Sequence, residues 1–560
     1  MSFAKNRPLL LISLVLATVL PVPLALAEGP YVIGSSNTVT ADPPISRPST
    51  KPCIVQLFKD VAFDNFDPYN FTYTPPADCP GPWAKVVFEA NISVTAGIQF
   101  DRTANFWIGG AAIYFGTTAE PSPTLGPAWH VESDLTDYSP LFTTTQSGQA
   151  DIGNLVNSQY TGIIYATANL EFYPLAENQN APVTADVVLP LSAGPDGGTV
   201  ALNTTTDQLA ATFSLPLNIE RAYLDVYAQS QSNDEFWYTC VPNDVSGELF
   251  SCGNTAFRET EVSIDGTPAG VAPISPWIYT GGIDPFLWFP LPGVQTLNFI
   301  PYRVDLTPFA GLLSSALPHT VAISVYNADS YFSATASLLL YLDHGSPQVT
   351  GAVTTNTISS GPDPVITEKL NTDSNGDITG SVSVTSARQF KVAGYVDTSH
   401  GRVATTVKQS MNFSNFQLFD ITSSVYVQNI TQKSTVNTIT TTNSNGASTQ
   451  TSRAWSFPLT FDIGEAFNAD GSGSLTSHAN QDYRISEVDR QNGAVTYTST
   501  LSNQVTPVDT LFFNSAGQIT GNQGQSSTQA YTFSDSQNHC YDVTLSATNN
   551  ALASFNSGCK

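Results

Sequence analysis

Two acidic residues, Asp234 and Glu235, stand directly before three aromatic residues and a cysteine in the segment QSNDEFWYTC, residues 231–240. Only 12% of the chain is charged, so this placement is unusual. One interpretation is a solvated strand end beside a disulfide. The other is a carboxyl group whose pKa is raised by burial against aromatic side chains. A carboxyl group that stays protonated can donate a proton to a leaving group, and an ionised one can activate water.

A second charged pair, Asp101 and Arg102, lies in the aromatic-rich segment 97–121. Successive residues of a strand point to opposite faces, so these two would not pair with each other unless the chain bends there. A structural ion pair at a strand end is the commoner cause of such a pattern. A carboxylate assisted by a neighbouring guanidinium is the alternative with chemical consequences.

Aromatic and polar residues near these acids could bind a sugar or a peptide. Tryptophan offers a flat apolar face, and Asp, Glu and Arg side chains bind hydroxyl groups, although packing in a core is the commoner fate of an aromatic ring. A disulfide between Cys240 and Cys252 would hold Glu235 near Arg258 and Glu259. The predicted substrate-binding residues are Trp107, Asp234, Trp237, Arg258, Glu259 and Trp288.

Other kinds of site find no support in the sequence. It contains no nucleophile elbow, P-loop, dinucleotide-binding glycine motif or HExxH motif. The cysteines lack zinc-ligand spacing and the six His are scattered, so we expect no metal and no cofactor. The net charge of -26 repels nucleic acid and anionic membranes and suits acidic surroundings.

The N-terminal sequence and the cysteines both indicate export. Basic residues, an apolar run and a small-residue cleavage site predict a signal peptide over residues 1–27. No later segment is long and apolar enough to span a membrane, so we expect a secreted protein, or a periplasmic one in a bacterium. Six cysteines allow 15 pairings. The economical pairing in an exported chain is Cys53–Cys79, Cys240–Cys252 and Cys540–Cys559.

The elements that must position these residues are strands. Helical periodicity is nearly absent, and short alternating runs such as 84–94, 162–173 and 319–327 are separated by Gly, Pro, Asn and Asp. This pattern predicts an all-β protein built from sandwiches, jelly rolls or barrels. We expect a polar lead-in (28–50), a first β domain (51–183), a second β domain (184–344), a linker (345–364) and a C-terminal β domain (365–560).

Several ordered segments between residues 51 and 344 resemble the acid peptide:N-glycanases, the glycopeptide asparagine amidase A family, which is more distantly similar to the bacterial enzyme PNGase F. The matching segments include FDRTANFWIGG (100–110), WHVESDLTDYSPL (129–141), NDEFWY (233–238), FRETEVSIDG (257–266) and YTGGIDPFLWFP (279–290). The resemblance implies hydrolysis of the amide between Asn and the innermost N-acetylglucosamine of an N-glycan, with Asn becoming Asp. It also implies two adjacent eight-stranded jelly rolls with the active site between them.

The resemblance assigns roles to individual residues. The FDR motif places a catalytic Asp at Asp101 and its neighbouring Arg at Arg102, and the NDEF motif places a catalytic Glu at Glu235. The family pattern departs at 153–162, where Asn154 or Asn157 stands in place of a further acid. The expected partners are N-glycosylated peptides and glycoproteins, bound by a monomer without any cofactor.

The expected mechanism uses Asp101 to activate water and Glu235 to orient the first sugar and donate a proton. Arg102 or Arg258 would stabilise charge on the amide oxygen. Two alternatives stay open at this point. One is a glycosidase with Asp101 and Glu235 as its acid–base pair, and the other is a non-catalytic glycan-binding β protein.

Overall fold

The computed structural model describes residues 31–559, and the predicted signal peptide lies outside the described residues. Strands are the main secondary structure of the described chain and helices are few, which confirms the all-β prediction. The two α-helices among the described residues, α1 (Asn243–Ser246) and α2 (Ala310–Leu313), have four residues each. No helix of the described part has the length and apolar character needed to cross a membrane.

The first domain is a sandwich of two four-stranded sheets. One sheet has the order β1 (Cys53–Phe63), β8 (Ile164–Pro174), β3 (Trp83–Val94), β6 (Ala128–Asp134), and the other has β2 (Tyr69–Tyr73), β7 (Gln146–Asp151), β4 (Thr103–Ile108), β5 (Ala111–Thr117). The 3-10 helix η1 (Thr136–Thr143) follows β6. Phe88 of β3 packs against Phe106 of β4 and Tyr114 of β5, so the core lies between the two sheets. The strand order 1-8-3-6 facing 2-7-4-5 is that of a jelly roll.

The second domain repeats this order. One sheet runs β10 (Val200–Thr204), β17 (Asp329–Leu342), β12 (Ile219–Ser230), β15 (Tyr302–Asp305), with β9 (Val187–Leu191) also paired to β17. The other sheet runs β11 (Leu209–Phe213), β16 (His319–Tyr326), β13 (Glu259–Ile264), β14 (Thr267–Pro273). The 3-10 helices are η2 (Ser232–Asp234), η3 (Trp237–Thr239) and η4 (Thr307–Phe309). The connection 175–186 separates the two domains, and the expected boundary at 183/184 falls within it.

The C-terminal part is one eleven-stranded antiparallel sheet. Its strands are β18 (Thr350–Asn356), β19 (Val365–Thr372), β20 (Ile378–Thr398), β21 (Gly401–Ile421), β22 (Val425–Ser444), β23 (Ala447–Phe467), β24 (Gly473–Gln491), β25 (Ala494–Phe513), β26 (Ile519–Asp535), β27 (Cys540–Thr548) and β28 (Ala551–Ser557). The prediction that 345–364 is only a linker needs correction, because β18 lies inside it and pairs with β20.

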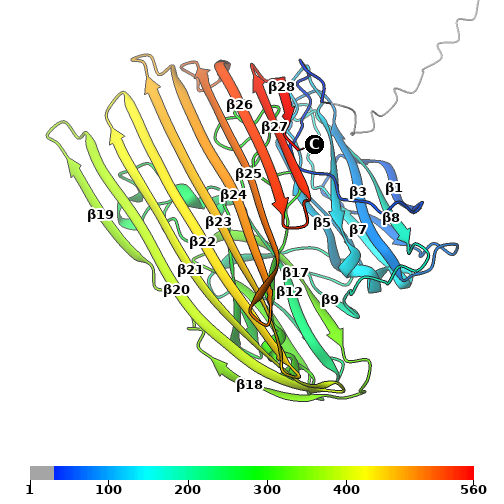
Figure 1. The fold of residues 1–560 in the computed structure, drawn as a ribbon. Helices are drawn as coiled ribbons and strands as arrows, with labels where there is room; N and C mark the ends of the chain where they lie inside the picture. The colour runs from blue at the N-terminus through cyan, green and yellow to red at the C-terminus, as the bar shows by residue number, and fades with distance from the viewer. Residues whose placement is uncertain (1–30, 560) are drawn as a thin grey trace, which may run out of the picture.

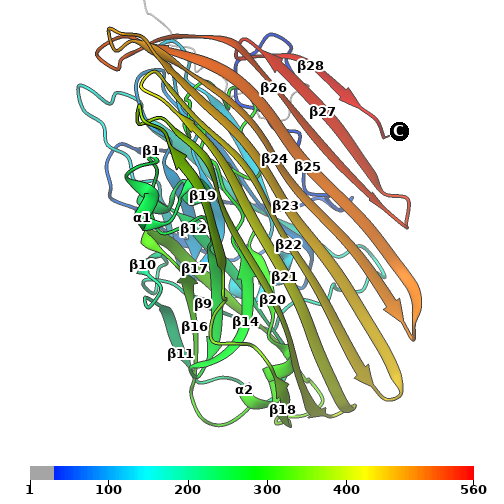
Figure 2. The same ribbon diagram turned by 90° about the vertical axis from the view of Figure 1, so that its left-hand side faces the viewer.

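The C-terminal sheet is curved and covers one side of the second jelly roll, as Figures 1 and 2 show. Its long strands alternate buried and exposed residues, so one face packs inward and the other meets solvent. Apolar residues of that inner face, among them Phe413 and Leu459, join the core of the second roll. The lead-in crosses to the same sheet, where Ala41 packs with Leu545.

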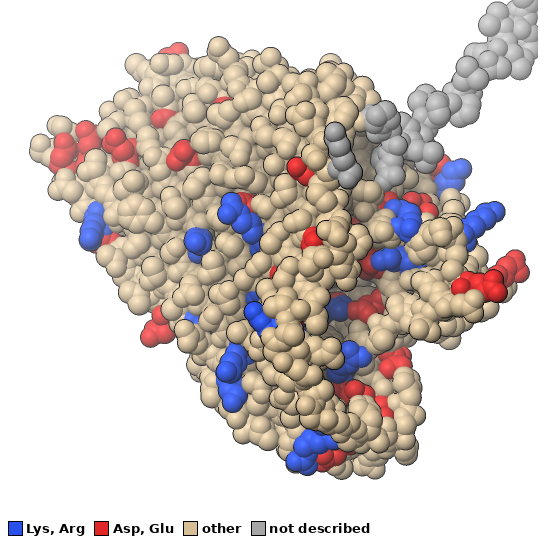
Figure 3. All heavy atoms as spheres, viewed as in Figure 1, with Lys and Arg blue, Asp and Glu red and all other residues tan. Residues whose placement is uncertain are grey.

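All three expected disulfides are present: Cys53–Cys79, Cys240–Cys252 and Cys540–Cys559. The face seen in Figure 3 is mostly uncharged, with acidic and basic side chains scattered over it. A buried cluster of charges lies instead between the second roll and the sheet. Arg388 of β20 binds the carboxylates of Glu259 and Glu261 of β13, the latter at 2.6 Å.

We predict that Arg388→Met lowers the free energy of unfolding by about 3–5 kcal/mol, because it leaves the carboxyl groups of Glu259 and Glu261 without the buried guanidinium that binds both. Guanidinium unfolding followed by tryptophan fluorescence at neutral pH measures this loss. Arg402→Met is the matched control, since the pair between Arg402 and Asp397 is largely exposed and its loss should change little. Equal stabilities of the two variants would contradict this account of the interface.

Candidate active site

Asp101 lies where the two jelly rolls meet. It stands in the connection between β3 and β4 of the first roll, two residues before β4 begins. Its carboxylate Oδ2 accepts a hydrogen bond of 2.8 Å from the Gly281 amide and one of 3.3 Å from the Thr280 hydroxyl, both from a loop of the second roll. The carboxylate of Asp101 therefore links the first roll, to which it belongs, to a loop of the second roll.

The segment 279–281 also contacts the chain that carries Glu235. Glu235 directly follows η2, and the residues just before η2 bind Tyr279. The Tyr279 hydroxyl donates to the Ser230 carbonyl at 2.6 Å and accepts from the Gln231 amide at 2.7 Å. The charge of Asp101 helps to raise the pKa of Glu235. Asp101 and Glu235, which are distant in sequence, therefore share one electrostatic environment.

A third carboxyl group, that of Glu120, completes the cluster and was missed by the sequence prediction. Glu120 follows β5, and its Oε1 accepts a hydrogen bond of 3.2 Å from the Asp101 backbone amide. Its own backbone amide donates to the Thr280 hydroxyl at 3.2 Å. Its carboxyl group also fills the space that a side chain at Gly281 would need. Glu120 lies in TTAEP (117–121), another of the segments that resemble the amidase family, but no role was predicted for it.

Burial is the main influence on all three carboxyl groups. It raises the pKa of Glu120 to about 8, and the charge of Asp101 adds to this effect. It raises the pKa of Glu235 to about 7, again with a contribution from Asp101. Burial also raises the pKa of Asp101, but the donors from Gly281 and Thr280 and the nearby Arg102 oppose this. The pKa of Asp101 is raised overall, but its carboxylate accepts two hydrogen bonds from the second roll that favour the ionised form.

Arg102 supplies the positive charge of this cluster. Its backbone amide donates to the Thr118 hydroxyl at 2.8 Å, and its Nη2 donates to the Gln99 side chain at 2.8 Å. Burial lowers the pKa of Arg102, and the charges of Asp101 and Glu120 oppose that effect. Among the described residues, Arg102 Nε has no hydrogen-bond partner. That nitrogen is buried, and the guanidinium as a whole places a positive charge beside the acids that can stabilise a developing negative charge.

The exposed aromatic surface beside the acids consists of Phe100 and Tyr160. Phe100 is 53% exposed, and its ring centroid lies 5.4 Å from that of Tyr160 in a tilted arrangement. The Arg102 guanidinium lies 5.9 Å from the centre of the Phe100 ring. Neither Phe100 nor Tyr160 is among the predicted substrate-binding residues.

The structure corrects the predicted substrate-binding tryptophans. Trp107, Trp237 and Trp288 are at most 1% exposed and belong to the core clusters. Three large flat side chains could equally serve ligand binding or core packing, and here core packing uses all of their surface.

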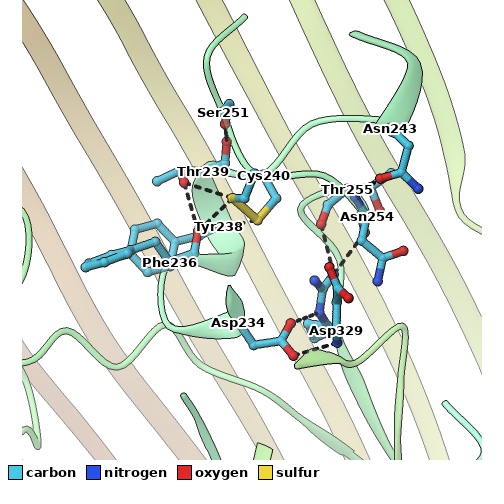
Figure 4. Close-up of a disulfide and its surroundings, with 12 residues drawn as sticks. Asp234, Phe236, Tyr238, Thr239, Cys240, Asn243, Ser251, Asn254, Thr255 and Asp329 are labelled. Carbon is cyan, nitrogen blue, oxygen red and sulfur yellow. Dashed lines mark hydrogen bonds and ion pairs between the residues drawn. A yellow bond between two sulfur atoms is a disulfide. The ribbon is translucent and has the colours of Figure 1, made fainter. Parts of the chain in front are cut away.

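The predicted polar binding residues are also turned inward. Asp234 accepts a hydrogen bond of 2.8 Å from Arg258 and one of 2.6 Å from the Asp329 amide, away from Glu235. Figure 4 shows Asp234 and Asp329 beside the disulfide that includes Cys240. Glu259 is paired with the sheet through Arg388. The Asp234–Arg258 pair holds the segment that carries Glu235, the Glu259–Arg388 pair holds β13 against the sheet, and both pairs are buried from a ligand.

Two other sets of polar side chains have structural partners. Asn154 is buried and donates to the Phe63 and Gly162 carbonyls at 2.9 and 3.1 Å. Outside the site, His130 and Glu132 lie with Glu89 at a spacing that could hold an ion. Arg47 of the lead-in pairs with Glu132 at 2.5 Å and already neutralises charge there.

Comparisons with known proteins agree with the resemblance found in the sequence. The model of the family described as "Peptide N-acetyl-beta-D-glucosaminyl asparaginase amidase A" matches residues 43–359, a range that includes Asp101, Glu120 and Glu235. The chain is 33% identical over 393 residues to the peptide-N4-(N-acetyl-beta-glucosaminyl)asparagine amidase A of Prunus dulcis, covering 66% of this chain and 67% of that protein.

Two solved structures are also similar to the chain. PNGase F, a glycosylasparaginase from Flavobacterium meningosepticum, is 13% identical, with 52% of this chain and 96% of that chain covered and a TM-score of 0.35. PNGF-II is 12% identical, with 52% of this chain and 66% of that chain covered and a TM-score of 0.37.

We predict that Glu120→Gln makes the protein's stability less sensitive to a rise in pH from 4.5 to about 8. The pKa of Glu120 is about 8 in the folded protein, above its ordinary value, so folding binds its proton and stability falls as pH rises toward 8. A neutral glutamine removes this loss. Melting temperatures measured between about pH 4 and pH 9 should fall less steeply for the variant than for the parent.

The control for this experiment is Glu177→Gln, which changes an exposed carboxylate in the connection between the rolls. Its melting temperatures should follow those of the parent at each pH. If Glu120→Gln and the parent lose stability equally as pH rises, the carboxyl group of Glu120 is not held protonated by its surroundings.

Proposed function

Because the chain belongs to the peptide N-acetyl-beta-D-glucosaminyl asparaginase amidase A family, we propose that it hydrolyses the amide bond between Asn and the innermost N-acetylglucosamine of N-glycosylated peptides and proteins. The products are a peptide with Asp at that position and a glycan released as its glycosylamine. We further propose that the protein is exported and acts in acidic surroundings, which its three disulfides and its net charge of -26 support.

One observation carries this proposal. Asp101 of the first roll accepts hydrogen bonds from Thr280 and Gly281 of the second roll, with the carboxyl groups of Glu120 and Glu235 close enough to interact with it electrostatically. Amide hydrolysis needs both an ionised group that activates water and a protonated group that assists departure of the amine. In this cluster the Asp101 carboxylate accepts hydrogen bonds, while the raised pKa values of Glu120 and Glu235 keep these two groups protonated. The cluster can therefore provide an ionised and a protonated carboxyl group at one pH.

In the proposed reaction, Asp101 takes a proton from water while the water oxygen attacks the amide carbon. Arg102, through the charge of its guanidinium, stabilises the negative charge that forms on the amide oxygen. The bond between the amide carbon and its nitrogen then breaks, and protonated Glu235 gives its proton to the nitrogen, which leaves with the sugar. Glu120 fixes the Asp101 backbone and, whenever it is ionised, makes the proton acceptor more basic.

The acid–base steps contribute about 10²–10⁴-fold to the rate. An oxyanion partner adds about 10²–10³-fold. We assign the exposed Phe100–Tyr160 surface to substrate contact, because a sugar ring or a peptide side chain can pack on its apolar face.

We predict that Asp101→Asn reduces glycan release from a defined N-glycopeptide by at least about 10²-fold, because the amide cannot accept a proton from water. The assay is run near pH 5, where Glu235 is protonated, and mass spectrometry reads the peptide product. The parent protein should yield a sugar-free peptide with the mass of Asp at the former glycosylation site.

The matched control is Asp64→Asn, which neutralises an exposed acid of the same roll and should leave the rate unchanged. A product that keeps one sugar on Asn would identify a glycosidase. Binding of the glycopeptide by the parent without any turnover would identify a glycan-binding protein, and release by Asp101→Asn at the parental rate would remove Asp101 from the mechanism.

A further inference from the structure

Amide side chains on the buried face of the C-terminal sheet bind the backbone of the two loops that bring the acids together. We propose that this sheet is a positioning element of the active site, and that Gln417, Gln428 and Gln481 are positioning residues for Glu235 and for the donors to Asp101. This inference rests on the proposed amidase activity.

The first loop is the segment that follows Glu235. Its three successive carbonyls at Tyr238, Thr239 and Cys240 each accept a hydrogen bond of 2.9 Å from the sheet. The donors are Asn415, Gln428 and Gln417, in that order. All three donor side chains are at most 3% exposed.

These amides also bind one another across β21 and β22. Gln428 Nε2 donates to Gln417 Oε1 at 2.7 Å, and Gln417 Nε2 donates to Asn415 Oδ1 at 2.9 Å. Asn415 Nδ2 in turn donates to Gln432 Oε1 at 2.9 Å. Each amide is therefore fixed in orientation by its neighbours, and hydrogen bonds in such a chain strengthen one another.

These carbonyls need donors from outside η3, because η3 has only three residues and its last carbonyls lack N–H donors further along a helix. The Thr239 carbonyl also accepts a hydrogen bond of 2.9 Å from the Ser251 hydroxyl. A buried carbonyl without a donor costs about 1–3 kcal/mol. On the same surface, the Trp237 ring lies 6.2 Å from the Phe413 ring of β21. The sheet thus fixes both the backbone and a large side chain within five residues of Glu235.

The second loop contains Thr280 and Gly281 and is held by the same kind of contact. Gln481 of β24 binds this loop at two points, before and after Gly281. Its Nε2 donates to the Pro276 carbonyl at 2.6 Å, and its Oε1 accepts from the Val294 amide at 2.8 Å. Gln525 of β26 donates to the Phe289 carbonyl at 2.6 Å.

Both loops lack the strand pairing that fixes the rest of the jelly rolls. Between the end of β14 at Pro273 and the start of β15 at Tyr302, no residue belongs to a strand. The hydrogen bonds of the sheet take the place of that pairing. Misplacement of a reacting group by about 1 Å can cost on the order of 10²-fold in rate. Loss of one of these hydrogen bonds should therefore slow catalysis even when the domains stay folded.

The test compares Gln428→Met with Gln409→Met. Methionine keeps the length of the side chain and removes the amide donor. Gln409 is the matched control, because it is a buried amide on β21 that donates to the carbonyl of Val271, which is paired within strand β14 and is not part of either acid loop. We expect kcat on an N-glycopeptide to fall about 10–100-fold for Gln428→Met, with a smaller change in KM, and to stay near the parental value for Gln409→Met.

A rescue variant separates positioning from folding. In Gln428→Glu, the protonated side chain can again donate to the Thr239 carbonyl, and the ionised side chain cannot. Its kcat should exceed that of Gln428→Met at acid pH and decline toward it as pH rises. Gln481→Met repeats the test at the second loop if Gln428→Met does not fold.

The outcomes separate this inference from the proposed function. Absence of glycan release by the parent protein would overturn the proposed function, and the positioning inference with it. Release by the parent together with parental kcat in folded Gln428→Met or Gln481→Met would overturn the positioning inference alone. A pH-independent kcat in Gln428→Glu, equal to that of Gln428→Met, would also overturn it.

Discussion

The hydrogen bond from the Gly281 amide to the Asp101 carboxylate is the contact on which the site depends. It joins residues that are 180 positions apart, so it exists only when both jelly rolls are folded and docked. Burial of the Asp101 carboxylate disfavours its charge and raises its pKa, and the donors from the second roll offset part of that cost. Glu120 and Glu235 then lie in the field of this anion, which raises the pKa of each.

The C-terminal sheet holds this arrangement through neutral groups. Asn415, Gln417 and Gln428 bind backbone carbonyls, and amides do not change charge between acid and neutral pH. The loops around the acids can therefore keep their position while the acids change protonation. A sheet rich in Ser, Thr, Asn and Gln is what such an interface requires, and the same composition suits its solvent-facing side.

The sequence predicted strands well because alternation is a local property that survives in the folded protein, as in β21. It identified Asp101 and Glu235 through motifs, but no spacing pattern could show that Glu120 approaches them. Buried ion pairs, such as that of Asp234 with Arg258, were predicted to bind substrate because ion pairs and binding sites use the same side chains. Burial decides between the two, and burial depends on long-range packing.

The most direct test of the account is the pKa of Glu235, measured by NMR titration of isotope-labelled glutamate in the parent protein and in Asp101→Asn. The pKa of Glu235 in the parent protein should be about 7, because burial raises it and the charge of Asp101 adds to the rise. The pKa of Glu235 should therefore move down toward its ordinary value when that charge is removed. An identical pKa in the two proteins would contradict the claim that these two side chains share one site.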